Sequence, residues 1–190
     1  MGVTHVVYEV DGWGAGELVV AEGQVVWHEL PWPHRSPAPP PRRPRDRSRD
    51  PSQTPTRPGV AGMASVLPEK SLSEARGFVP DVVRRLEAYF AGERIAFDDV
   101  AVDLEYDTPF FERCAVALRS VPRGEVVTYG ELAALAGAPG AARAAGSFCA
   151  RNRLGLFVPC HRVVAADGLG TYGSYGVGYK RRLLELEGAL

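Results

Sequence analysis

Residues 128–151 read TYGELAALAGAPGAARAAGSFCAR, and this stretch decides the fold of the second half of the chain. Thr128 and Glu131 have the spacing of a capping box, which predicts that a helix begins here. The glycines and the proline of residues 137–140 end that helix, and a second one is expected over residues 141–151. Two short helices joined by a glycine-containing turn indicate a helix-turn-helix.

The first half of the second helix has only small side chains apart from one arginine. Residues 141–146 read AARAAG, so Arg143 stands alone among small residues. Small residues such as Ala142 and Gly146 let a helix backbone approach a DNA groove, and the pattern fits the minor groove as well as the major one. The same residues also permit close packing against a core, so both interpretations stay open. The lone Arg143 favours DNA.

A third helix is expected before this pair. Thr108-Pro109 is a helix-start signal, and apolar residues follow it at helical spacing: Phe111, Cys114, Ala115 and Leu118.

Residues 155–164, GLFVPCHRVV, bring a cysteine and a histidine together after the helical region. A nucleophilic cysteine needs a lowered pKa or a neighbouring base, and His161 directly follows Cys160. Side chains at adjacent positions of a straight strand point to opposite faces, so contact between the two needs a turn at Pro159 or a bridging water. The other two cysteines, Cys114 and Cys149, are interpreted as structural.

Residues 1–107 predict a small α+β unit. Short strands are expected at residues 6–10 and over residues 17–29. A helix is expected over residues 80–91, with its proline in the first turn, and a further strand over residues 96–104.

A proline- and arginine-rich insertion interrupts this unit at about residues 31–60. Residues 31–58 hold ten of the sixteen prolines and show no apolar periodicity. Such a segment buries too little surface to offset its ordering entropy, so disorder is expected. A spacer is favoured over a basic arm that touches DNA, because proline-rich linkers are the commoner case.

Composition narrows the classes of protein further. The net charge of −1 conceals a C-terminal region, residues 109–190, with ten basic and six acidic side chains, which could face phosphates. No apolar stretch is long enough to span a bilayer, and no secretory signal is recognised. Three cysteines without a CxxC pair or a Cys/His cluster argue against zinc and favour a reducing cytoplasm.

These motifs resemble the O6-alkylguanine-DNA alkyltransferase family. Residues 157–164, FVPCHRVV, are similar to the active-site signature of that family. The resemblance extends to RGEVVTY at residues 123–129, to Asn152, and to the tail from Lys180 to Gly188. It covers residues 108–188 closely and residues 1–107 only in outline.

The resemblance implies a fold and a reaction. The fold is an α+β N-terminal domain, ribonuclease-H-like, at residues 1–107, followed by a mostly α, winged-helix-like C-terminal domain with a helix-turn-helix at residues 108–190. The reaction is the irreversible transfer of the alkyl group from O6-alkylguanine in double-stranded DNA to Cys160, once per molecule. It implies a cytoplasmic monomer that needs neither cofactor nor metal. A structural zinc is not expected, because residues 1–107 contain no cysteine.

The resemblance also assigns catalytic roles. Cys160 would accept the alkyl group, and His161 would take the thiol proton through a water molecule. Glu187, on a helix near the C-terminus, would hold His161 in the required tautomer. Tyr129 would hydrogen-bond the guanine ring and help to neutralise it as it leaves.

Further residues would contact DNA and the flipped base. Arg143 would enter the base stack where the damaged nucleotide has been swung out, with Ala142 and Gly146 beside it on the helix. Asn152 would brace the turn before the active site. Backbone groups of Cys160 and Val163 would read the guanine edge, and Ser174 would contact its O6.

One loop departs from the family pattern. Residues 168–178, GLGTYGSYGVG, lack the usual adjacent glycine pair. Counting back from Lys180 places Ser174 at the family serine, whereas matching the Gly-Tyr step favours Tyr172. Tyr175 either narrows the pocket or covers it, which leaves the preference between methyl and bulkier groups open.

Two other classes of protein remain alternatives. Alkyltransferase-like lesion-binding proteins flag damage without chemistry, but they replace the active cysteine, and Cys160 argues against that class. A helix-turn-helix regulator or a cysteine hydrolase of related ancestry is the third possibility. A regulator would normally have a dimerisation element, and none is recognised in the sequence.

Overall fold

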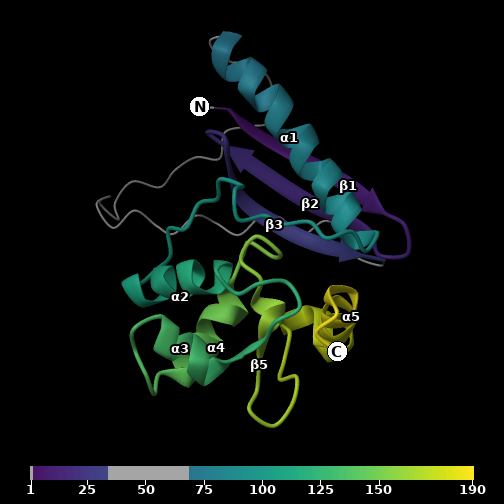
Figure 1. Cartoon of the computed structure of the whole chain (residues 1–190). Helices are drawn as coiled ribbons and strands as arrows, with labels where there is room; N and C mark the ends of the chain where they lie inside the picture. Colours follow the sequence, from purple (N-terminus) through teal and green to yellow (C-terminus); the bar gives the residue numbers. More distant parts are fainter. Residues whose placement is uncertain (1, 34–68) are drawn as a thin grey trace, which may run out of the picture.

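A computed structural model describes residues 2–33 and 69–190. Most of the insertion predicted at residues 31–60 therefore lies outside the described residues, whereas Pro31 and Trp32 belong to a β-strand. Figure 1 shows a sheet with a long helix across it, followed by a cluster of shorter helices. Within the described ranges, no helix is both long and apolar enough to cross a membrane.

The sheet has three antiparallel strands in the order β1 (Val3–Val10), β2 (Gly14–Ala21) and β3 (Gln24–Trp32). The continuous strand expected over residues 17–29 is instead divided between β2 and β3. Glu22 and Gly23 have φ values of 54° and 75°, which form the turn between the two strands. Glutamate seldom adopts a positive φ, so the sequence did not reveal this turn.

The long helix α1 spans Glu69–Phe90 and packs on the sheet. The prediction that it begins at Pro80 was wrong, because Pro80 lies inside it. A proline inside a helix removes one backbone hydrogen bond, and its ring crowds the carbonyl one turn earlier. Packing of the helix against the rest of the protein can offset this loss of stability. Four buried side chains of α1 supply the packing: Val82, Leu86, Tyr89 and Phe90.

The strand expected over residues 96–104 does not form. Only Val102 bridges to the sheet, in parallel with Val25 of β3. Two backbone hydrogen bonds of 2.9 Å flank this bridge. A turn at Asp98 and Asp99 precedes it, so the alternating apolar pattern reflects a loop that packs on the core rather than a paired strand.

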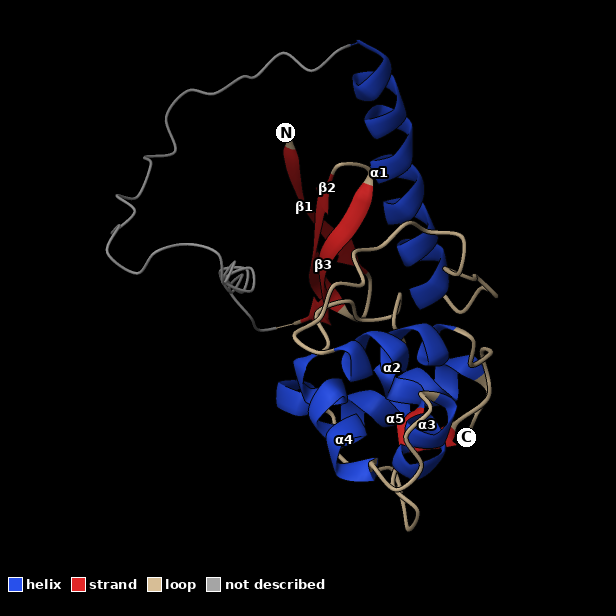
Figure 2. Ribbon diagram, turned by 90° about the vertical axis from the view of Figure 1, so that its left-hand side faces the viewer, coloured by secondary structure: helices blue, strands red, loops and turns tan. Residues whose placement is uncertain are grey.

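The two helices predicted over residues 128–151 are present as α3 (Tyr129–Leu135) and α4 (Ala142–Arg151). The capping box is complete: the Thr128 hydroxyl accepts from the Glu131 backbone at 3.1 Å, and the Glu131 carboxylate accepts from the Thr128 backbone at 2.6 Å. Figure 2 shows this helical cluster stacked below the sheet.

The remaining elements of the cluster connect these helices to residues 157–164 and to the chain end. They are α2 (Pro109–Arg119), β4 (Val127–Thr128), the 3-10 turn η1 (Cys160–Arg162), β5 (Val163–Val164), the 3-10 turn η2 (Gly173–Tyr175) and α5 (Gly176–Glu187). Thr108 caps α2 as predicted, accepting from the Phe111 backbone at 3.3 Å. Strands β4 and β5 pair in parallel, which places the start of α3 beside the chain that leaves η1.

The sheet and the helical cluster meet along β3. The backbone of His28 donates to the Arg153 carbonyl at 2.9 Å, and its ring Nδ1 lies 2.5 Å from the Gly155 carbonyl oxygen. The other ring nitrogen is 2.6 Å from the Tyr8 hydroxyl. Burial lowers the pKa of His28 to about 4, so the ring is neutral near pH 7. His28 therefore fastens the segment that leads to Cys160 onto the sheet.

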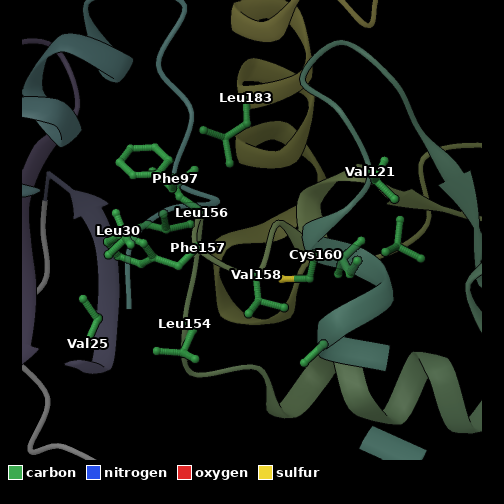
Figure 3. Packing of buried hydrophobic residues seen from close by; sticks show 14 of the residues in the cluster. Val25, Leu30, Phe97, Val121, Leu154, Leu156, Phe157, Val158, Cys160 and Leu183 are labelled. Atoms are coloured by element: carbon green, nitrogen blue, oxygen red, sulfur yellow. The ribbon is translucent and has the colours of Figure 1, made fainter. Parts of the chain in front are cut away.

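Apolar packing continues this connection towards the site (Figure 3). Leu30 of β3 faces Leu156 and Phe157, and the Cys160 sulfur lies at the inner end of the same cluster, beside Val158. The turn that contains Cys160 thus rests on a core shared by both halves of the described chain.

Candidate active site

Cys160 begins a tight turn rather than continuing a strand. Pro159 precedes the 3-10 turn η1, in which Cys160 and His161 are both buried. The Asn152 side-chain amide, at the end of α4, donates to the Cys160 sulfur at 3.2 Å and to the Val158 carbonyl at 2.7 Å. The turn expected at Pro159 is therefore present, and the Asn152 amide is hydrogen-bonded to the residues on both sides of that proline.

The Cys160 thiol is held in its protonated form. Burial raises its pKa, and the Asn152 hydrogen bond, the positive charge of Lys180 and a hydrogen bond from Tyr172 offset this only in part. Because the thiolate is the reactive species, such a cysteine depends on a base that removes its proton as the reaction proceeds.

A histidine lies next to it in the sequence and is held by a carboxylate. Nε2 of His161 is 3.0 Å from Oε1 of Glu187, the last residue of α5. Burial lowers the pKa of His161, so the ring is neutral and able to accept a proton. Its other nitrogen, Nδ1, is buried and has no hydrogen-bond partner among the described residues. That nitrogen is the one available to a bridging water.

Glu187 is the centre of a larger network than the sequence indicated. Arg162 donates to both of its oxygens, at 2.9 and 2.8 Å, and the Tyr89 hydroxyl donates at 2.6 Å. Burial works to raise the pKa of Glu187, but its bonds to His161 and Arg162 outweigh burial and hold the pKa well below its ordinary value. The carboxylate is thus ionised and fixes the imidazole.

A cavity of about 370 Å³ opens beside Cys160, between β3, α4 and the loop after β5. Ser174 and Tyr172, the residues that the two alignments of this loop select, both line it. Tyr175 also lines it, and its hydroxyl accepts from the Leu30 backbone at 3.1 Å. Tyr175 therefore joins the loop to β3 at the cavity wall. Cys149, interpreted as structural from the sequence, lines the same cavity.

Tyr129 and Lys180 both contact the loop that follows β5. The ammonium of Lys180 is fully buried and donates to the carbonyls of Val163 and Leu169. It also lies 6.0 Å from the centre of the Tyr129 ring. A Cβ on Gly170 would be 3.3 Å from the Tyr129 hydroxyl, so this loop passes close to the ring.

The residues of α4 that were predicted to face DNA differ in their exposure. Arg143 is exposed, and within the described ranges its side chain has no hydrogen bond or ion pair. Ala142, in the first turn of α4, is half-buried. A Cβ on Gly146 would lie 3.9 Å from the Tyr129 ring, so the helix packs close to Tyr129 there.

Three residues that contact the site were not found by sequence reasoning: Tyr89, Arg162 and Tyr106, whose hydroxyl donates to the Asn152 oxygen at 3.2 Å. Tyr89 and Tyr106 precede residue 108 and belong to no motif, so no local signal could have found them. Arg162 lies inside the quoted signature, but only the fold shows that it pairs with Glu187. As for metals, the described part of the chain contains no group of three His, Cys, Asp or Glu side chains placed to hold an ion.

Residues 109–189 match the family model described as 6-O-methylguanine DNA methyltransferase, DNA binding domain. The chain is 45% identical over 126 residues to a methylated-DNA–protein-cysteine methyltransferase of Methanopyrus kandleri, covering 65% of this chain and 93% of the relative. It is 48% identical over 111 residues to the protein of the same name in Mycobacterium tuberculosis, covering 58% and 66%.

Solved structures of similarly named proteins resemble this chain over nearly its whole length. The O6-methylguanine methyltransferase of Mycobacterium tuberculosis superposes with a TM-score of 0.67 at 29% identity, covering 99% of this chain and 94% of that one. A structure of the Mycobacterium tuberculosis protein in complex with DNA gives a TM-score of 0.66 at 31% identity, covering 97% and 92%.

Proposed function

Because the chain belongs to the 6-O-methylguanine DNA methyltransferase family, we propose that Cys160 is the cysteine that receives the alkyl group. The protein is a methylated-DNA–protein-cysteine methyltransferase, and it repairs DNA by alkyl transfer. The observation that carries the choice of Cys160 is its setting. Its sulfur accepts a hydrogen bond from Asn152, and the adjacent His161 is bonded to an ionised Glu187.

The reaction is a single displacement at carbon. The Cys160 sulfur attacks the alkyl carbon, a carbon–sulfur bond forms, and the bond between that carbon and O6 of guanine breaks. The thiol proton passes through a water molecule to Nδ1 of His161, whose other nitrogen is held by Glu187. Guanine leaves with the bonding electrons, and Tyr129 supplies a hydrogen bond that stabilises it. Burial raises the pKa of Tyr129, so its hydroxyl keeps the proton needed for this bond.

Each molecule acts once. The product is a thioether, and its carbon–sulfur bond is stable under these conditions. None of the assigned residues offers a route to restore the thiol. The added alkyl group also enlarges a side chain that is buried on its inner side, so the alkylated protein is expected to be less stable than the free one.

DNA is bound through the helix-turn-helix formed by α3 and α4, with α4 in the minor groove and the damaged base flipped into the cavity beside Cys160. Arg143 fills the space left in the base stack, which its exposure and lack of protein partners among the described residues support. Backbone groups of Cys160 and Val163 read the guanine edge, and Ser174 contacts O6. Ala142 and Gly146 keep the helix surface narrow.

We also propose a fold type for each of the two domains. The N-terminal domain, residues 1–107, is ribonuclease-H-like, and the C-terminal domain, residues 108–190, is winged-helix-like. The described structure itself has an antiparallel sheet and a set of helices, as its structural relatives do. We also propose a cytoplasmic monomer, since three free thiols suit a reducing compartment.

Intact-mass measurement and peptide mapping test the proposed reaction. The protein is mixed with duplex DNA that contains one O6-methylguanine. We expect one added methyl group, on the peptide that holds Cys160 and absent in Cys160→Ala. Unmodified protein that still binds the lesion tightly would contradict the proposal and indicate a lesion-binding role without chemistry.

A further inference from the structure

The side-chain amide of Asn152 uses its full hydrogen-bonding capacity. Its nitrogen donates to the Cys160 sulfur at 3.2 Å and to the Val158 carbonyl at 2.7 Å. Its oxygen accepts from the Leu154 backbone at 3.1 Å and from the Tyr106 hydroxyl at 3.2 Å. An asparagine amide can make two donor and two acceptor bonds of this kind.

The direction of this amide matters for the thiol. The oxygen and nitrogen ends have nearly the same shape, so hydrogen bonds decide which end faces Cys160. With the nitrogen towards sulfur, the amide stabilises a thiolate; with the oxygen there, it would repel one. The Leu154 N–H can only donate and the Val158 carbonyl can only accept, so these two backbone groups set the direction of the amide. The Tyr106 hydroxyl adds a bond to the oxygen end, which restrains the amide and polarises it, so that the bond from its nitrogen to the sulfur is stronger.

Tyr106 is itself held on both sides. The Arg153 guanidinium lies 4.8 Å from the centre of its ring, and the ring of Phe148 meets it edge-on at 5.4 Å. Arg153 is anchored in turn by the Asp103 carboxylate at 3.0 Å and by the Glu105 carbonyl at 2.9 Å. The ring contacts involve no hydroxyl group, so a phenylalanine could occupy the same place.

We propose that Tyr106 is a positioning residue for alkyl transfer, whose hydroxyl bond to the Asn152 oxygen holds the amide nitrogen against the Cys160 sulfur and strengthens that contact. The inference rests on the proposed function for its effect on repair, but its effect on the thiol is independent of DNA. Tyr106 does not touch the sulfur; it acts through Asn152. It lies two residues before the Thr108 cap of α2, outside the stretch that the family model matches.

The variant Tyr106→Phe tests this directly. In the free protein, the rate of Cys160 alkylation by iodoacetamide is measured against pH, with peptide-resolved mass spectrometry to separate Cys160 from the other two cysteines. The loss of one neutral hydrogen bond should raise the midpoint of the Cys160 titration by about half to one pH unit. An unchanged midpoint would overturn the proposal.

Methyl transfer from saturating duplex DNA provides the second measurement. At neutral pH, we expect Tyr106→Phe to slow single-turnover transfer about three- to ten-fold, and the difference to vanish above both midpoints. In an Asn152→Ala background, Tyr106→Phe should cause no further shift of the midpoint, because the amide on which it acts is gone. A further shift there would show that Tyr106 acts by another route and would overturn the proposal.

Tyr179→Phe is the matched control. It also removes a single tyrosine hydroxyl, which donates to the Pro31 carbonyl at 2.8 Å and not to Asn152. We expect it to leave the Cys160 midpoint unchanged, and an equal shift in this variant would contradict a specific role for Tyr106. If wild-type protein receives no methyl group, the proposed function fails, whereas the iodoacetamide titration still decides the role of Tyr106.

Discussion

The Tyr89 hydroxyl donates a 2.6 Å hydrogen bond to Oε1 of Glu187, although 98 positions separate the two residues in the chain. The same oxygen lies 3.0 Å from Nε2 of His161. The carboxylate that orients the proposed base is therefore held in part by α1, a helix that packs on the sheet. This relationship makes the chemistry dependent on the N-terminal half.

Tyr89→Phe should weaken both stability and transfer. A hydrogen bond to a charged group contributes about 1.5–3 kcal/mol, so we expect the free energy of unfolding to fall by about 2 kcal/mol. A less firmly held Glu187 should also slow single-turnover methyl transfer several-fold. Urea denaturation and quenched-flow transfer assays measure the two effects, and an unchanged transfer rate would rule out a role for Tyr89 in orienting the carboxylate.

Glu187→Gln should change how stability depends on pH. The folded-state pKa of Glu187 is depressed, so its contribution is fully present above the ordinary glutamate pKa of about 4.3 and is lost as the pH falls towards the folded value. Removing one partner of a buried charged network costs about 3–5 kcal/mol. We expect that gap between wild type and variant at pH 7, and a smaller gap at pH 3. Urea denaturation across this range measures it, and a gap that does not change with pH would contradict the assignment.

Arg143→Ala should slow the reaction with duplex DNA and leave the reactivity of the Cys160 thiol unchanged. Since Arg143 is exposed, its removal should alter the free energy of unfolding by less than about 0.5 kcal/mol. Reaction of Cys160 with iodoacetamide and with free O6-methylguanine base should not change. Transfer from duplex DNA should slow at least about ten-fold, because nothing then fills the stack beside the flipped base. Equal slowing with the free base would show that Arg143 acts on the pocket instead.

Gly146→Ala distinguishes the two interpretations of the small residues on α4. The added methyl would make an ordinary contact, 3.9 Å from the Tyr129 ring. Replacing glycine inside a helix should raise the free energy of unfolding by about 0.5–1 kcal/mol. If this face approaches a DNA groove, affinity for duplex DNA should nevertheless fall a few-fold, which is the outcome we expect in a fluorescence-anisotropy titration. Unchanged affinity would favour packing as the only role of Gly146.

Tyr175→Ala should widen the range of alkyl groups that the cavity accepts. The Tyr175 ring lies 5.7 Å from that of Trp32, and its hydroxyl is bound to the Leu30 backbone. Removing the ring should raise the rate with O6-benzylguanine relative to O6-methylguanine, measured in competition on matched duplexes. Tyr175→Phe keeps the ring, so it should retain the wild-type preference. The same preference in Tyr175→Ala would mean that Tyr175 only covers the pocket.

Local sequence signals predicted the helical half of the structure well. The capping box of Thr128 and Glu131 and the cap at Thr108 act within one helical turn, so they can be identified without knowing the fold. Cys160 and His161 were identified by adjacency and by the resemblance of their motif. The contact between His161 and Glu187 was an expectation carried by the resemblance alone, and the geometry brings the two residues together.

The rest of the site depends on contacts between distant segments. Tyr89 and Tyr106 carry no motif, and their roles follow from hydroxyl groups that tertiary packing places beside Glu187 and Asn152. The errors in the N-terminal half have the same origin. Pro80 is tolerated inside a helix that packs on the sheet, and apolar alternation after residue 96 reflects burial rather than strand pairing.

The attachment of Gly155 to His28 bears on how this reactive cysteine could be transplanted. A cassette cut to residues 109–189, the part that the family model matches, would keep Cys160 and Glu187. It would lose His28, which anchors the approach to the cysteine on the sheet. The segment that the family model matches is therefore smaller than the structure that holds Cys160 in place. A label-accepting tag engineered from this protein would have to carry the β-sheet with it.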